Sequence, residues 1–137
     1  LWRLNQNGPC DYHDIGKRAT DTDPLRHCSR GAALFSQAYE KALDGRERIF
    51  YSIACDLCRY HHERWDGTGG PEHLSGDDIP IIARAGAVAD AWDYLDTQKP
   101  QLSQKEKLQC LKAYAGTWYD PELVAALERL FPVQPVE

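Results

Sequence analysis

The sequence predicts an all-α domain, and three observations support this class. Apolar residues recur every three or four positions along most of the 137 residues, which is the spacing of one helix face. Apolar and polar residues alternate over no more than a few positions, so no strand is expected. Capping, proline and glycine signals separate the apolar stretches. A chain of this length can bury one hydrophobic core, so we expect a single domain of about six helices over residues 1–137.

Residues 1–10 form a lead-in segment, and six helical segments follow it. Their expected bounds are 13–17, 25–44, 46–62, 79–95, 103–115 and 120–131. The second segment follows Asp23-Pro24, where a capping residue precedes a proline at the first helical position. Its expected apolar stripe consists of Leu25, Ala32, Phe35, Tyr39 and Leu43. Asp44-Gly45 is expected to close this helix as a C-terminal glycine signal.

The later helices have their own signals. The third segment is expected to turn Phe50, Ile53, Ala54, Leu57 and Cys58 inward. Ile79-Pro80 opens the fourth segment, whose wide apolar face predicts burial near the centre of the fold. Ser103 to Glu106 form a capping-box pattern, and Gly116 stops the helix that this pattern starts. Asp120-Pro121 starts the last helix.

The stretch between the third and fourth helices is expected to be a functional loop. Residues 63–78 contain four glycines and one proline and show no apolar period. Long loops inside compact domains usually carry function. We therefore expect a glycine-rich active-site loop here.

Composition limits the function classes. The chain has 16 basic and 21 acidic side chains, a formal net charge of −5 and no run of five like charges. We therefore expect neither duplex nucleic-acid binding nor attraction to an anionic bilayer. No window approaches the roughly 18 apolar residues of a membrane span, so no membrane insertion is expected. Five irregularly spaced cysteines are typical of buried thiols in a reducing compartment, and a cytoplasmic location is expected.

An adjacent histidine and aspartate, His13 and Asp14, form the first candidate ligand pair. A neighbouring imidazole and carboxylate can bind one cation, and the second carboxylate oxygen can bridge to another. Lys17 lies four positions after His13 and therefore on the same edge of a helix. Taken alone, this pair is more typical of an ordinary polar helix end.

Three further residue positions favour a metal site. His61 and His62 are adjacent at a helix end, and adjacent helical positions diverge by ~100°, so both cannot point into an apolar core. Asp90 lies in an apolar stretch, where a buried carboxylate is costly unless it is paired or binds a metal. We therefore expect these residues and His27 to surround metal. His73, in the glycine-rich loop, is expected to be an ordinary exposed histidine.

At these motifs the chain resembles HD-GYP domains of the HD phosphohydrolase superfamily. The resemblance covers residues 11–131 and rests on His13-Asp14-Ile15-Gly16-Lys17, His27 with Gly31-Ala32, the stretch from His61 to Pro71, Ile79-Pro80, Ala83-Arg84, Val88-Ala89-Asp90, Asp93, Lys99-Pro100, Gly116-Thr117 and Asp120-Pro121-Glu122-Leu123-Val124. It implies an all-α HD-domain bundle around a metal cavity. It also implies two or three divalent metals, iron or manganese, and hydrolysis of cyclic di-GMP.

The resemblance further implies roles for individual residues. The implied metal ligands are His13, Asp14, His27, His61, His62 and Asp90, with Asp14 as the bridging carboxylate. The implied substrate-binding residues are Gly69, Gly70, Pro71, Arg84 and Lys99. The expected reaction is attack of a metal-bridged hydroxide on phosphorus, with Lys17 adding positive charge at the scissile phosphate. An upstream receiver or sensor domain is an expected partner.

The chain departs from the family pattern in three places. Gly70 replaces the tyrosine of Gly-Tyr-Pro, and Gln101 and Leu102 follow Lys99-Pro100 where the family has Tyr-Arg, so weaker recognition of cyclic di-GMP is predicted. Asp14 and His27 are only thirteen positions apart, a shorter spacing than is typical of the family. The family's earliest ligands precede the His-Asp pair, so we expect either upstream helices outside this chain or one metal with fewer ligands.

Several alternatives therefore stay open at this point. The substrate could be a related cyclic dinucleotide rather than cyclic di-GMP. The domain could also be a catalytically weak or inactive signalling module. A third alternative is a broader HD-type nucleotide phosphohydrolase, or an iron oxygenase that uses the same ligands.

Overall fold

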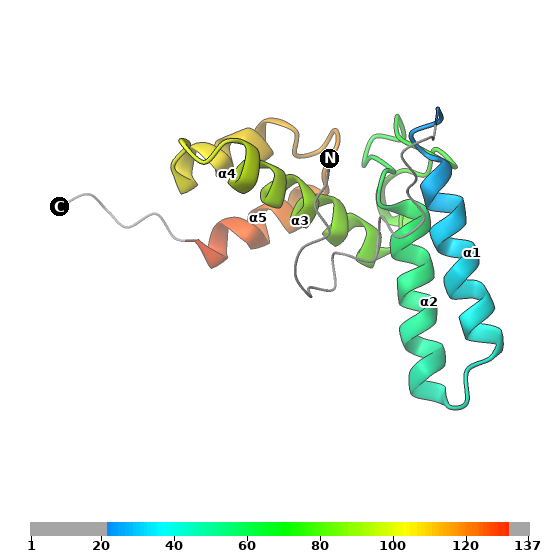
Figure 1. Ribbon diagram of the computed structural model, residues 1–137. Coiled ribbons are helices and arrows are strands. Elements are labelled where there is room, and N and C mark those ends of the chain that lie inside the picture. The colour runs from blue at the N-terminus through cyan, green and yellow to red at the C-terminus, as the bar shows by residue number, and fades with distance from the viewer. Residues whose placement is uncertain (1–21, 132–137) are drawn as a thin grey trace.

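The computed structural model describes residues 22–131, and this part of the chain is all-helical, as predicted (Figure 1). The helices are α1 (Arg26–Glu40), α2 (Gly45–Tyr60), the short 3-10 helix η2 (Gly76–Asp78), α3 (Ile81–Gln98), α4 (Gln104–Ala113) and α5 (Pro121–Leu130). Within residues 22–131, strand-type pairing is limited to one isolated bridge between Ala115 and Tyr119. The lead-in segment 1–10 and the predicted helix over 13–17 lie outside the described residues.

α1 and α2 form an antiparallel hairpin, and α3 to α5 lie beside the end of it that is far from its connecting turn (Figure 1). The facing sides of the hairpin bury Ala32 and Phe35 of α1 against Ala54 and Cys58 of α2. This packing fixes the register of the two helices. It also places the start of α1 beside the end of α2.

The turn between α1 and α2 differs from the prediction. Asp44 does not close the first helix, because it is the N-cap of α2 and its carboxylate accepts hydrogen bonds from the amides of Arg46 and Glu47 at 2.7 and 2.9 Å. α1 instead ends at Glu40, and Leu43, which was predicted on its apolar stripe, is 92% exposed in the turn. A capping carboxylate satisfies amides that have no partner within the helix. The aspartate therefore starts α2 rather than ending α1.

Two residues predicted on the inner side of α2 are also exposed. Phe50 is 53% and Ile53 is 45% exposed, whereas Ala54, Leu57 and Cys58 are buried. The reason is that the C-terminal helices contact the hairpin at one end only (Figure 1). Ile53 lines an open cavity with Ile81, Ile82 and Ala85 of α3, so α3 covers this side chain only in part.

A second core joins the three C-terminal helices. Val88 of α3, Leu111 of α4 and Val124 of α5 are buried against one another. α3 is less buried than its wide apolar face predicts, and Ile81 is 57% exposed. Its first half packs on α2 and its second half on α4 and α5, so each half keeps an open side. Among the described helices, none is both long enough and apolar enough for a bilayer crossing.

The predicted capping signals of the last two helices are confirmed. Ser103 and Glu106 form a reciprocal capping box at the start of α4. Gly116 follows the end of α4 with a φ of 83°, a left-handed conformation that favours glycine. Asp120 caps α5 immediately before Pro121. The local signals therefore placed these ends correctly.

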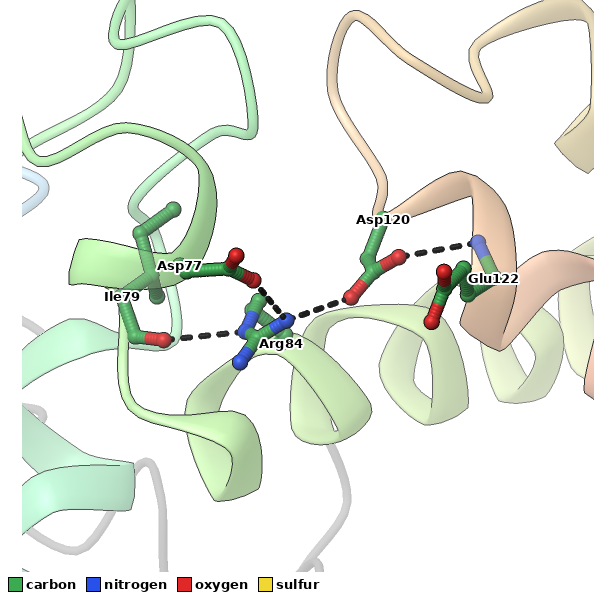
Figure 2. A network of polar contacts seen from close by, with 5 residues as sticks. All are labelled: Asp77, Ile79, Arg84, Asp120 and Glu122. Carbon is green, nitrogen blue, oxygen red and sulfur yellow. Dashed lines mark hydrogen bonds and ion pairs between the residues drawn. The ribbon is translucent and has the colours of Figure 1, made fainter.

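A buried ion pair ties the start of α3 to the start of α5 (Figure 2). Arg84 Nη1 lies 2.7 Å from Asp120 Oδ2, and the two side chains are 15% and 3% exposed. The other oxygen of Asp120 accepts the amide of Glu122 at 2.9 Å and so caps α5. Arg84 Nε donates to the carbonyl oxygen of Ile79 at 2.9 Å, and Nη1 also donates to the exposed Asp77 at 3.2 Å. The network fixes α3, α5 and the loop before α3 relative to one another.

Asp120→Ala should strongly destabilise the fold. It leaves the largely buried Arg84 guanidinium without its main partner, which costs about 3–5 kcal/mol, and it removes a helix cap worth about 1 kcal/mol. Urea unfolding measures the loss. The control is Lys112→Ala, which breaks an α4–α5 ion pair whose side chains are 51% and 45% exposed. That variant should lose less than about 1 kcal/mol, and equal losses in both variants would contradict the assignment.

Candidate metal centre

The C-terminus of α2 orients the first of the two adjacent histidines. His61 is the C-cap residue of α2 and is 5% exposed. Its Nδ1 donates to the carbonyl oxygens of Leu57 and Cys58 at 3.0 and 2.9 Å, because carbonyl oxygens can only accept. With the proton on Nδ1, the lone pair of the neutral imidazole lies on Nε2. This Nε2 lies 3.2 Å from Nε2 of His27.

His27 and His62 complete a cluster of three imidazole rings. The ring centre of His27, in the first turn of α1, lies 5.2 Å from that of His61 and 5.0 Å from that of His62. The rings of His61 and His62 are 4.2 Å apart, because α2 ends at Tyr60 and both residues follow in a turn. His27 and His61 are buried and His62 is exposed. The structure thus brings these three predicted ligands together, with an opening at His62.

Cys28 adds a fourth donor atom to this cluster. One ligand atom from each of His27, Cys28, His61 and His62 lies within 4.8 Å of the others. Imidazole nitrogen and thiolate sulfur are donors that suit zinc and iron. The four residues therefore fit a transition-metal ion. Sequence reasoning missed Cys28, although its position next to His27 was an available signal.

A cavity of about 340 Å³ opens beside the histidines. His61 and His62 line it together with Asp90 of α3 and Tyr119. Burial, and to a smaller extent the negative charge of Asp90, raises the pKa of Tyr119. The predicted ligand Asp90 therefore lies on the cavity wall, outside the group of four converging donors.

Part of the cavity wall is aromatic. Tyr94, Tyr114, Trp118 and Tyr119 line it together with Arg64. Trp118 stacks on Tyr114 with ring centres 4.5 Å apart, and the guanidinium carbon of Arg64 lies 3.9 Å from the centre of the Trp118 ring. Tyr94, Tyr114 and Trp118 are 47%, 44% and 38% exposed. Exposed rings and a guanidinium plane form a surface on which nucleobases can stack. Sequence reasoning missed this surface as well.

The loop over 63–78 is held by a buried glutamate. Glu63 is 4% exposed. Its Oε1 accepts the amide of Glu72 at 2.6 Å, and its Oε2 accepts the amide of Leu74 at 3.0 Å. Both carboxylate oxygens thus bind the loop's own backbone. His73, between the two bound amides, is exposed, as predicted.

Two glycines let the same loop pack directly on the segment that follows the histidines. A Cβ on Gly69 would lie 2.5 Å from the backbone nitrogen of Arg64 and closer still to the carbonyl oxygen of His62. Gly70 is buried, and its amide donates to the same carbonyl oxygen at 3.3 Å. These contacts are structural. The implied contact of Gly69, Gly70 and Pro71 with substrate stays a prediction.

Two backbone hydrogen bonds attach this loop to the turn between α4 and α5. The Trp65 amide donates to the Trp118 carbonyl oxygen at 3.1 Å, and the Asp66 amide donates to the Thr117 carbonyl oxygen at 2.9 Å. These bonds fix Trp118 against the segment that contains Arg64. The histidine end of α2 and the aromatic wall are therefore directly connected.

The remaining predicted site residues lie away from the cluster or outside the described part of the chain. The Arg84 guanidinium is engaged in the network at the start of α3 (Figure 2). Lys99 is the exposed C-cap of α3 and does not line the cavity. Substrate binding by these two side chains stays a prediction. His13, Asp14 and Lys17 lie outside the described residues.

Comparison with known proteins identifies similar chains. The profile of the HD domain matches residues 36–123. The chain is 32% identical over 125 residues to 3'3'-cGAMP-specific phosphodiesterase 2 of Vibrio cholerae, covering 84% of this chain and 24% of that protein. It is 31% identical over 142 residues to cyclic di-GMP phosphodiesterase PA4108 of Pseudomonas aeruginosa, covering 90% of this chain and 32% of that protein. A crystal structure of a cyclic GMP-AMP-specific phosphodiesterase of V. cholerae matches with a TM-score of 0.62 at 27% identity, over 77% of this chain and 22% of that one.

The fold and the buried histidine cluster define a helical domain built around a candidate metal site. The chain belongs to the HD domain family. Its relatives and its structural neighbour confirm the predicted resemblance to the HD-GYP type. The chain spans only 24% and 32% of the length of the two curated relatives described above.

Glu63→Ala should loosen the loop over 63–78. Hydrogen bonds to a charged group contribute about 1.5–3 kcal/mol, and both are lost from a buried position. The hydrogen-exchange rates of the Glu72 and Leu74 amides should therefore increase by more than the rates of the amides in α5. The control is Thr68→Ala, which removes an exposed hydrogen bond to Asp66 in the same loop and should change stability by less than about 0.5 kcal/mol. Unchanged exchange in Glu63→Ala would show that the glutamate does not hold the loop.

Proposed function

We propose that this domain is a metal-dependent phosphodiesterase that hydrolyses cyclic di-GMP or a related cyclic dinucleotide. The observation that carries the proposal is the convergence of His27, His61 and His62 beside a cavity with a partly aromatic wall that includes Arg64. The family membership supports it, because the relatives described above are phosphodiesterases for cyclic di-GMP and 3'3'-cGAMP.

The proposed cofactor is a set of two or three divalent metal ions, iron or manganese. His27, His61 and His62 would hold metal through their imidazoles, and Asp90, His13 and Asp14 complete the proposed ligand set. Such an ion supplies Lewis acidity toward a phosphoryl oxygen and lowers the pKa of water. The described donors suit this chemistry because His27 and His61 are buried and the α2 carbonyl oxygens orient the imidazole of His61.

The chain's own residues orient the reacting groups. The α2 carbonyls hold His61 so that Nε2 rather than Nδ1 faces the cluster. Arg64, kept over Trp118, places a guanidinium at the cavity wall, and Lys17 is proposed to bring a second positive charge to the scissile phosphate. Fixed positive groups stabilise the charge that grows on phosphoryl oxygens in the transition state.

The aromatic wall favours a nucleotide as the occupant of the cavity. Base stacking on aromatic side chains contributes about 1–3 kcal/mol per base, and Tyr94, Tyr114 and Trp118 each present exposed ring surface. The cavity volume of about 340 Å³ lies near the small end of ligand sites, which span about 300–1,000 Å³. We therefore expect one nucleotide half of the substrate to fill the cavity.

An upstream receiver or sensor domain is the proposed partner. The support for it is that the curated relatives are about three to four times longer than the part that matches this chain. Such a domain would regulate the phosphodiesterase rather than take part in the chemistry. The cytoplasmic location stays a prediction from cysteine usage.

His62→Ala should lower the affinity for metal by at least about tenfold, because a ligand contributes more than the outer groups whose loss already costs 10- to 100-fold. Hydrolysis of cyclic di-GMP and of 3'3'-cGAMP should be lost with it. Metal analysis after dialysis and chromatography of the products measure the two effects. His73→Ala is the control, because His73 is exposed outside the cluster, and it should leave both unchanged. Absence of turnover by the metal-loaded unmodified chain would contradict the proposal and favour an inactive signalling module.

Tyr94→Leu should raise KM for a cyclic dinucleotide with little change in kcat, because Tyr94 lines the cavity and is 47% exposed. Loss of about 1–3 kcal/mol of stacking corresponds to about a 5- to 150-fold increase. A nitrophenyl phosphodiester has no nucleobase, so its hydrolysis should keep its rate. Phe50→Leu, which alters an exposed aromatic residue of α2 outside the cavity, is the control. Equal effects on both substrates would rule out a stacking role for Tyr94.

A further inference from the structure

We propose that Cys28 binds metal through its sulfur, so that this centre combines a thiolate with imidazole ligands. The inference rests on the proposed metal-dependent function, since it needs a metal ion at the histidine cluster. It concerns a residue of this chain that lies next to His27 and that none of the implied HD-GYP ligand roles includes.

The donor spacing fits a shared ion. Cys28 Sγ lies 3.7 Å from Nε2 of His27. Bonds of about 2.3 Å to sulfur and about 2.1 Å to nitrogen, at a tetrahedral angle, place two such donors roughly 3.6 Å apart. The Nε2 atoms of His27 and His61 lie 3.2 Å apart, near the roughly 3.4 Å that two nitrogen ligands show at the same angle. Two of the donor separations among Cys28, His27 and His61 thus match those that one ion requires, and one donor atom from each residue lies within 4.8 Å of the others.

The surroundings of Cys28 differ from those of an ordinary buried cysteine. Cys28 and Cys58 are both 0% exposed. Cys58 packs with Ala32, Phe35 and Ala54 in the apolar core of the hairpin. Cys28 instead shares a cluster with three imidazoles. Because Cys58 is as buried as Cys28 but has apolar neighbours, it serves as the matched control for Cys28.

Sulfur ligation would change the metal preference of the site. On binding, the S–H proton passes to solvent and a metal–sulfur bond forms, with no change in oxidation state. Thiolate is a softer ligand than carboxylate, and it favours zinc and iron over manganese. Of the two metals implied by the HD-GYP resemblance, iron is therefore the one that Cys28 selects.

Cobalt(II) titration of the whole chain tests the inference. A sulfur-to-cobalt charge-transfer band in the near ultraviolet requires a thiolate ligand, so the unmodified chain should develop this band. Cys28→Ser should lose the band and bind cobalt at least about tenfold more weakly, while Cys58→Ser should keep both. X-ray absorption at the metal edge of the unmodified chain should show a sulfur neighbour, and this result does not depend on the folding of a variant.

The outcomes separate this inference from the proposed function. Cobalt bound without a sulfur band or a sulfur neighbour would overturn the role of Cys28 and leave the metal-dependent function standing, because Cys28 would then be an ordinary thiol beside His27. A band that survives in Cys28→Ser would also overturn it. No cobalt binding at all would overturn both proposals.

Discussion

The hydrogen bonds from His61 Nδ1 to the last carbonyls of α2 are the constraint on which the site depends. Carbonyls at a helix C-terminus have no partner within the helix. Here two of them accept from one imidazole, so the same bonds finish the helix and decide that Nε2 faces His27. Ligating histidines commonly donate their other nitrogen to such an acceptor. The same two hydrogen bonds therefore end α2 and orient the candidate ligand.

The two cores have different tasks in this arrangement. The hairpin core sets the register of α1 and α2 and so determines that His27 and Cys28 meet the end of α2. The second core positions α4 and α5, and the turn between them supplies Trp118. Glu63 and Gly69 fold the intervening loop back on itself immediately after the histidines, and backbone bonds from Trp65 and Asp66 then attach it to that turn. The loop therefore fixes the position of one core relative to the other.

The all-α class and the capped starts of α4 and α5 could be predicted because each leaves a local mark in the sequence, whereas the meeting of His27 with His61 and His62 was expected from the family resemblance. The predicted cap at Asp23-Pro24 was wrong, because α1 begins at Arg26 after Leu25, whose amide donates to Asp23 Oδ1 at 2.9 Å. Asp44 could not be assigned locally, since Asp-Gly fits both the end of one helix and the start of the next. The exposure of Phe50 was missed because periodicity identifies an apolar face and not whether another helix covers it. The aromatic wall was missed for a related reason: only the folded chain brings Tyr94 of α3 to Tyr114 and Trp118 after α4.

Gly70, where the chain departs from the family pattern, packs closely against Leu25. A Cβ at this buried position would lie 2.6 Å from Cδ1 of Leu25, so a tyrosine here would require Leu25 to move aside at the start of α1. Cδ1 is the far end of a flexible, half-buried side chain, so a rotamer change of Leu25 could make this room. Two of the aromatic side chains that line the cavity lie at the turn between α4 and α5, where Trp118 stacks on Tyr114 and its ring centre lies 3.9 Å from the guanidinium carbon of Arg64. The exposed rings beside the histidines therefore lie on the turn that the backbone bonds of the loop reach, rather than at Gly70 in the loop itself.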